Sequence, residues 1–162
     1  MSRILVPRVE DSVVLVTGAS GGIGRAVAAA FASKGARVFG TSRKPASVRD
    51  APSGVEFLEW DAHEESGADA CVAAALKRAG RVDILVCNAG IGIGGSIEDV
   101  PMADAVRQFD ANVFGVLRML RAVLPGMRER RSGLVLVVAS AAGRIAVPFQ
   151  GHYSASKFAL EG

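Results

Sequence analysis

Short apolar runs of strand length alternate along this chain with longer segments whose apolar residues recur at helical spacing. The short runs cover Val13–Val16, Arg37–Gly40, Val55–Glu59, Val82–Cys87 and Leu134–Ser140. The segments of helical period cover Ile23–Lys34, Glu64–Ala79 and Met102 to about Met127, and a further helix starts at His152. Such alternation is typical of successive βαβ units, which build a parallel sheet covered by helices on both faces.

The pattern predicts an α/β fold whose doubly wound parallel sheet holds five strands in the order 3-2-1-4-5, with flanking helices. Gly35 ends the first helix, and Pro125 is expected to kink or terminate the third. The last run, Leu134–Ser140, would leave an apolar sheet edge unpaired. We therefore expect residues 1–162 to form a single, incomplete domain, truncated on its C-terminal side.

Composition narrows the class of protein. A chain of 162 residues with 50% hydrophobic and 22% charged residues can bury one sizeable core. Its 19 basic and 16 acidic residues are mostly interspersed. Only Met127–Arg131 is locally basic, and a solvated helix end explains it better than a nucleic-acid surface does, so we expect no nucleic-acid partner.

The cysteines, the histidines and the N-terminus argue for a reducing compartment and against a metal or a membrane. Cys71 and Cys87 lack the spacing of a disulfide framework, which favours the cytoplasm. Asp61 lies two residues before His63, but no third ligand follows, so we predict no metal. Ile4–Val6 is too short for a signal segment or a membrane span.

A glycine-rich turn, TGASGGIG at Thr17–Gly24, lies directly after the first strand and before the first helix. This is the context of a dinucleotide-binding turn in a Rossmann-type fold. Gly18 allows a tight reversal, Gly22 lets a pyrophosphate approach, and Gly24 lets the helix pack closely. The helix N-terminus then offers free N–H groups to the phosphates. Methyltransferases that bind S-adenosylmethionine also use such a turn, so the glycines alone do not choose the cofactor.

The residues after the second and third strands bear on that choice. Thr41 to Lys44 contains no acidic residue, whereas an NAD-preferring site usually places one there on the ribose hydroxyls. Arg43 can instead pair with a 2′-phosphate, and Ser42 would not repel it. Asp61 is positioned to meet the adenine amino group. We therefore expect NADP(H) to be preferred, with NAD(H) possible.

Together with Asn112 and Ser140, three motifs make the chain resemble a classical short-chain dehydrogenase/reductase: TGASGGIG, CNAG at Cys87–Gly90 and YSASK at Tyr153–Lys157. VLRML and SKFALEG look closest to the hydroxysteroid and retinol dehydrogenase branch. Cys87 departs from the usual asparagine, with little expected effect. Because the turn also fits the extended pattern of nucleotide-sugar epimerases and dehydratases, that class stays an alternative. CNAG and the short gap from Ser140 to Tyr153 favour the classical branch.

The spacing of Tyr153 and Lys157 supports the same chemistry. They lie four apart on the predicted helix, so their side chains share one face. A free tyrosine has a pKa of about 10. A cation about 4 Å away, at an effective dielectric of about 20, contributes roughly 4 kcal/mol, enough to lower that pKa by up to about three units. The phenol can then exchange a proton with the reacting oxygen.

Ser140 is expected at the carboxyl end of the last strand, where ligands of open α/β sheets bind, and its hydroxyl can hydrogen-bond the substrate oxygen. The resemblance implies the same role for Ser140. It also implies that Asn112 holds a water near Lys157 in a proton relay, and that Lys157 bonds the nicotinamide ribose. The expected catalytic residues are therefore Asn112, Ser140, Tyr153 and Lys157.

The leading hypothesis is an NADP(H)-dependent oxidoreductase that interconverts a carbonyl and a primary or secondary alcohol. The expected cofactor contacts are Gly18, Ser20, Gly22, Ile23, Gly24, Arg43, Asp61, Asn88, Ala89, Gly90, Tyr153 and Lys157. The resemblance implies a small alcohol or ketone substrate, which Ile145–Phe149 suggests is lipophilic, and a homodimer or homotetramer in the full-length form. A truncated, non-catalytic nucleotide-binding fragment is the competing hypothesis.

Overall fold

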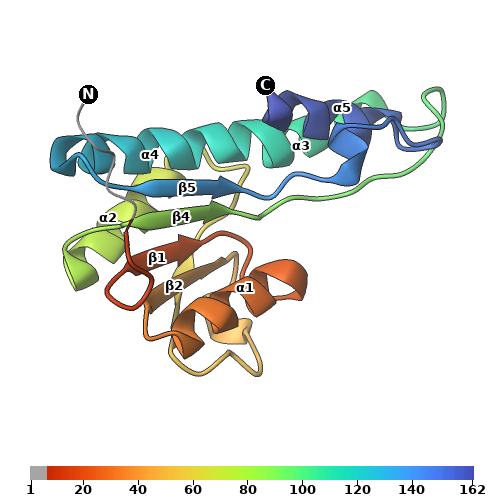
Figure 1. The fold of residues 1–162 in the computed structure, drawn as a ribbon. Coiled ribbons are helices and arrows are strands. Elements are labelled where there is room, and N and C mark those ends of the chain that lie inside the picture. The colour runs from red at the N-terminus through yellow and green to blue at the C-terminus, as the bar shows by residue number, and fades with distance from the viewer. Residues whose placement is uncertain (1–6) are drawn as a thin grey trace.

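The computed structural model describes residues 7–162, so Ile4–Val6 lies outside the described part of the chain. Five parallel strands form one sheet in the order β3-β2-β1-β4-β5 (Figure 1). This confirms the predicted fold class and strand order. The strands are β1 Val13–Val16, β2 Arg37–Ser42, β3 Val55–Glu59, β4 Ile84–Cys87 and β5 Leu134–Val137.

Helices cover both faces of the sheet (Figure 1). They are α1 Gly22–Ser33, α2 Gly67–Ala79, α3 Met102–Phe109, α4 Gly115–Arg130 and α5 Gly151–Glu161, with a π-helical turn η2 at Asp110–Phe114 and 3₁₀ turns η1 at Pro45–Ser47 and η3 at Ala141–Gly143. Successive strand residues point to opposite faces. In β1, Val13 and Leu15 pack with side chains of α2 and α4, whereas Val14 and Val16 pack with those of α1.

Several predicted boundaries were displaced. β2 continues to Ser42, β4 starts at Ile84 instead of Val82, and α2 starts at Gly67 instead of Glu64. β5 ends at Val137, so Ser140 is not a strand residue. Its Oγ accepts a hydrogen bond from the Ala142 N–H at 3.2 Å and starts the turn η3. A hydroxyl that caps a turn competes with strand pairing, and a purely apolar pattern does not reveal that.

Two parts of the prediction for the helix from Met102 to about Met127 were wrong, namely that it is continuous and that Pro125 could end it. The π-helical turn η2 interrupts it, and α4 continues past Pro125 to Arg130. A proline inside a helix costs about 3 kcal/mol. Val123 and Met127 on either side of it are both buried in the core, and each contributes about 1.5–3 kcal/mol. Burial therefore outweighs the lost backbone hydrogen bond.

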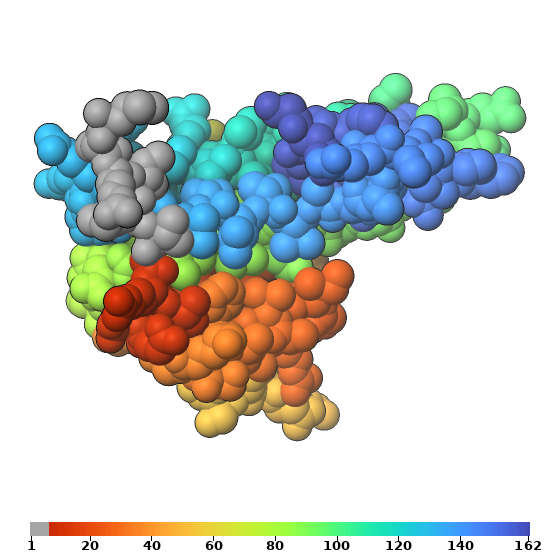
Figure 2. All heavy atoms as spheres, viewed as in Figure 1, coloured from red at the N-terminus to blue at the C-terminus, as the bar shows by residue number. Residues whose placement is uncertain are grey.

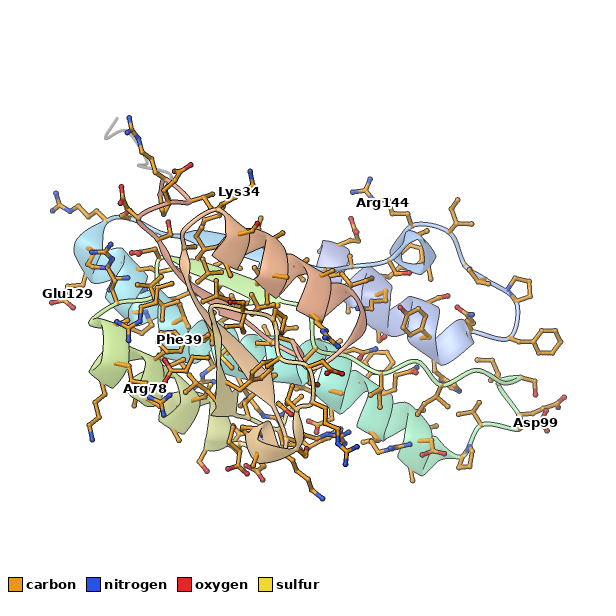
Figure 3. All side chains as sticks on the ribbon, turned by 90° about the horizontal axis from the view of Figure 1, so that it is seen from below. Lys34, Phe39, Arg78, Asp99, Glu129 and Arg144 are labelled. Atoms are coloured by element: carbon orange, nitrogen blue, oxygen red, sulfur yellow. The ribbon has the colours of Figure 1, made fainter. Side chains whose placement is uncertain are left out.

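The strand β5 lies at the edge of the sheet, as its apolar sequence and position predicted. Leu136 and Val137 are partly exposed there. Among residues 7–162, no helix is both long enough and apolar enough to cross a membrane. The side chains of the central strands, Phe39 among them, fill the interior between the helical layers (Figure 3).

Candidate functional site

The glycine turn joins the carboxyl end of β1 to the N-terminus of α1. Gly18 has φ +66°, a left-handed conformation that favours glycine, and a Cβ there would lie 2.9 Å from the Ala89 Cα. A Cβ on Gly24 would lie 2.3 Å from the Asn88 Nδ2 and 2.4 Å from the Gly18 carbonyl oxygen. The turn therefore keeps its shape only with glycine at both positions.

Two threonines and one asparagine brace this turn. The Thr17 Oγ1 accepts hydrogen bonds from the backbone N–H groups of Asn88 (2.9 Å) and Ala89 (3.0 Å). The Thr41 Oγ1 accepts one from the Gly18 N–H at 3.1 Å. The Asn88 Nδ2 donates to the Thr17 carbonyl at 3.0 Å. Sequence reasoning missed both threonines, although a buried hydroxyl at a strand's carboxyl end is a usable signal.

A cleft of about 570 Å³ opens beside the turn. Of the expected cofactor contacts, it is lined by Gly18, Ser20, Gly22, Ile23, Arg43, Asp61, Asn88, Ala89 and Gly90. Further lining residues were not among the expected contacts, namely Gly21, Thr41, Ser42, Trp60, Ala62, His63, Ile91 and Ala111, although Ser42 was expected beside a 2′-phosphate. Gly24 is absent from the lining and instead packs behind the turn. Neutral turn atoms thus occupy one end of the cleft, and the exposed Arg43 lies at its border.

A charged cluster holds the loop after β3 against the π-helical turn η2. The Asp110 carboxylate contacts the His63 Nδ1 at 2.7 Å and accepts a hydrogen bond from the Arg118 Nη2 at 2.8 Å. Arg118 also donates to the Ala62 carbonyl at 2.8 Å. Burial alone would raise the pKa of Asp110, but the hydrogen bonds and charges of His63 and Arg118 together hold it below its ordinary value of 3.8.

Two smaller clefts contain three of the four expected catalytic side chains, and Asn112 lines neither of them. One, of about 180 Å³, is lined by Ile23, Asn88, Gly90, Ile91, Gly92, Val138, Ala139, Tyr153 and Lys157. The other, of about 400 Å³, is lined by Gly92, Ile93, Gly94, Ser140, Gln150 and Tyr153. Tyr153 borders both, and Asn88 borders both the 570 Å³ cleft and the 180 Å³ cleft. The fold therefore brings Tyr153 and Lys157 next to the glycine turn, and Ser140 lies one cleft further along with Tyr153.

Lys157 is buried on α5 and reaches back across the sheet edge. Its Nζ donates to the Val138 carbonyl at 3.1 Å and lies 5.9 Å from the centroid of the Tyr153 ring. Only 6% of the residue is exposed, and burial lowers its pKa from 10.5. An ammonium group with few compensating contacts is thus held beside a phenol.

Asn112 lies in the π-helical turn η2 and is fully buried. Its Oδ1 accepts a hydrogen bond from the Ile91 N–H at 2.8 Å. Its Nδ2 donates to the Ile91 carbonyl at 2.9 Å and to the Ser156 Oγ at 3.0 Å. The amide therefore ties the loop after β4 to α5.

Two loops extend beyond the sheet at this end of the molecule. The loop between β4 and α3 lies beside the segment between η3 and α5 (Figure 2), and the Gly95 N–H donates to the Phe149 carbonyl at 2.7 Å. Asp99 marks the tip of the first loop (Figure 3). Ile97, Ile145 and Phe149 are exposed on these loops. Large apolar side chains are therefore exposed on both loops.

Comparison with known proteins extends these observations. A model of the short chain dehydrogenase family matches residues 12–162. A 3-ketodihydrosphingosine reductase from Bacteroides thetaiotaomicron is 39% identical over 153 residues, covering 94% of this chain and 56% of the relative. A 17-beta-hydroxysteroid dehydrogenase type 1 from Mus musculus is 41% identical over 166 residues, covering 94% of this chain and 48% of the relative.

The fold is shared at the level of solved structures. A short-chain dehydrogenase from Streptomyces avermitilis superimposes with a TM-score of 0.87 at 40% identity, covering 93% of this chain and 57% of that one. The chain thus spans about half the length of the curated relatives it matches.

Proposed function

The chain belongs to the short-chain dehydrogenase family, and we propose that the full-length protein transfers a hydride between NADP(H) and a carbonyl or alcohol. One observation carries the proposal. Tyr153 lines one cleft together with Ser140 and a second cleft together with Lys157. The second cleft adjoins the cleft beside the glycine turn. A dinucleotide spanning these clefts would bring its nicotinamide end to the phenol.

In this mechanism Tyr153 is the acid–base group. The buried ammonium of Lys157 stabilises the phenolate, so the phenol exchanges its proton with the substrate oxygen more easily. The Ser140 hydroxyl donates a hydrogen bond to the same oxygen as negative charge develops there. The cofactor, when bound, supplies or accepts the hydride. Asn112 contributes by fixing the loop at Ile91, which borders the cofactor.

The residues present suit a dinucleotide phosphorylated on its ribose. α1 begins at Gly22 in the turn, so its N-terminal N–H groups lie beside the proposed pyrophosphate position. At the far end of the cleft, the exposed Arg43 supplies a guanidinium for a 2′-phosphate. Asp61 lines the same end, where its carboxylate can accept a hydrogen bond from the adenine amino group. NAD(H) would use the same site more weakly.

The proposed substrate is a lipophilic ketone or alcohol. The exposed Ile97, Ile145 and Phe149 favour an apolar molecule at the approach to Tyr153. Relatives named for a hydroxysteroid and for ketodihydrosphingosine agree with that class.

Exposed apolar side chains and buried thiols support a proposed assembly and a proposed location. Exposed apolar side chains on α3, α4 and α5 support a homodimer or homotetramer, and they include Met102, Val106, Leu117, Leu124 and Phe158. Cys71 and Cys87 are free thiols, and burial raises the pKa of each to about 12. Inert free thiols are compatible with the cytoplasm.

Replacing Tyr153 by Phe tests the mechanism. With NADPH and 2-decanone or a 17-ketosteroid, the full-length Tyr153→Phe variant should lose about 10³-fold in kcat, because general acid–base catalysis contributes 10²–10⁴-fold. Cofactor binding should persist. Titration calorimetry of the variant with NADPH measures that binding directly, and the expected site is the cleft that Trp60 lines. Unchanged kcat in this variant would refute the mechanism.

The cofactor preference has its own test. Arg43→Ala should weaken NADPH binding about tenfold and leave NADH binding unchanged, because only NADPH carries the 2′-phosphate. Arg37→Ala serves as a control, since Arg37 stacks over Phe39 and does not line the cleft. Equal losses for the two cofactors would show that Arg43 does not set the preference.

A further inference from the structure

The loop that follows β4 is held by two amide side chains from one helical segment. The Asn112 side chain forms hydrogen bonds with both the N–H and the carbonyl of Ile91. Gln108, four residues earlier on α3, accepts a hydrogen bond from the Ile93 N–H through its Oε1. The two amides therefore hold alternate residues of the same loop.

The two anchored residues face different clefts. Ile91 lines the cleft beside the glycine turn and the cleft of Lys157. Ile93 lines neither of these and borders the cleft that holds Ser140, Gln150 and Tyr153. One amide thus fixes the cofactor side of the loop, and the other fixes its substrate side.

Burying Gln108 at this position has a cost in folding free energy. It is fully buried, and its Nε2 has no hydrogen-bond partner among residues 7–162. An unsatisfied buried donor costs about 1–3 kcal/mol, a penalty that leucine of similar size would avoid. The compensating interaction is the one bond made by its Oε1. At this position the hydrogen-bond acceptor of the Gln108 side chain is used, and its donor is not.

We propose that Gln108 is a positioning residue that sets the substrate side of the active site by fixing Ile93. This rests on the proposed function, because it assigns the Ile93 cleft to the carbonyl substrate. Gln108 touches neither the substrate nor the cofactor. It acts through the backbone that forms the wall opposite Ser140.

The test removes the acceptor and then restores it. Gln108→Leu in the full-length protein should raise the KM for 2-decanone about tenfold, since the loss of a hydrogen bond to a buried N–H is of that order. The kcat should change less than the KM, and the affinity for NADPH, measured by titration calorimetry, should stay the same. Gln108→Glu keeps an acceptor and needs no donor, so it should restore much of the KM.

Amide hydrogen exchange of the peptide covering Gly92–Gly94 gives a readout independent of activity. Exchange should be faster in Gln108→Leu and close to wild type in Gln108→Glu. Gln108→Asn, which withdraws the acceptor by one methylene, provides a smaller perturbation if the leucine variant does not fold. Arg107→Leu, on the exposed side of the same helix, is the matched control.

The outcomes separate the two proposals. A wild-type protein inactive on all carbonyl probes would refute the proposed function, whereas faster exchange in Gln108→Leu would still show that Gln108 fixes the loop. Unchanged exchange at Gly92–Gly94, or equal losses of substrate and cofactor affinity, would overturn the role of Gln108.

Discussion

The proposed cofactor side and the proposed substrate side of this site are built differently, although both lie at the carboxyl end of one sheet. On the cofactor side, fully buried strands present backbone groups that Thr17 and Thr41 brace directly. On the proposed substrate side, the loops after β4 and η3 extend beyond the sheet (Figure 1), and buried amides of α3 and η2 hold the first of them. One side depends on close backbone contact, and the other on side chains that reach across elements.

The largest expected effect is at Gly24, where close backbone contacts leave no room for a side chain. Gly24→Ala places a Cβ within 2.4 Å of two polar atoms, including the Gly18 carbonyl oxygen. The variant should lose about 3 kcal/mol in its free energy of unfolding, because overpacking a tight contact costs this much. Urea denaturation measures it. NADPH should also bind more weakly, because the turn must shift.

Gly21→Ala is the matched control for this prediction. Gly21 has an extended backbone with φ −162°, and a Cβ there meets nothing within 4 Å. Its stability should stay within about 0.5 kcal/mol of wild type, the usual range for surface substitutions. Equal destabilisation at Gly21 and Gly24 would contradict the packing account of the turn.

A paired substitution of two hydroxyls sharpens the comparison. Thr17→Val leaves the N–H groups of Asn88 and Ala89 without their acceptor and should cost about 2 kcal/mol in the free energy of unfolding. Ser140→Ala removes the acceptor of one local bond and should cost about 0.5 kcal/mol, while it lowers kcat. Calorimetry and steady-state kinetics on both variants would reveal this exchange of roles. A lower free energy of unfolding for Ser140→Ala than for Thr17→Val would contradict this comparison.

The smallest effect concerns the pH dependence of stability through Lys157. Because its pKa is lowered in the folded state, the unfolded chain binds more protons between that pKa and 10.5, so wild-type stability rises with pH across this window. Below the window, the penalty for burying the ammonium is present in full. Lys157→Met removes the penalty, so its stability relative to wild type should be highest there and should decline toward pH 10.5.

Urea titrations across this pH range measure the difference between Lys157→Met and wild type. Lys34→Met is the control, because Lys34 is exposed at the end of α1 (Figure 3) and its removal relieves no burial of an ammonium group. A constant difference for Lys157→Met would show that burial of the ammonium does not affect stability.

The same contrast explains what could be predicted from the sequence. The strand order and the glycine turn were predictable because the apolar runs and the requirement for Gly18 are local properties of the chain. The shared clefts of Tyr153, Lys157 and Ser140 follow from that order, since parallel strands end at one edge.

What escaped prediction depends on contacts between distant segments. The bond between Gln108 and Ile93 leaves no periodic signal, because a buried glutamine in a polar stretch resembles a surface residue. In the sequence, Thr17 and Thr41 look like ordinary residues at the ends of strands. Pro125 was expected to kink or terminate its helix, since local rules give no weight to the burial of Val123 and Met127 around it.

A single carboxylate links the two sides. Asp110 holds His63, beside the proposed adenine end of the site, and lies two residues before Asn112 in the π-helical turn. Because the hydrogen bonds and charges of His63 and Arg118 hold the pKa of Asp110 below its ordinary value, the carboxylate is ionised at neutral pH and the attachment persists there. Redesigning the loop after β3 to accept a different nucleotide therefore also disturbs the support of the reaction centre. Changing the proposed cofactor preference therefore involves two parts of the fold that Asp110 couples.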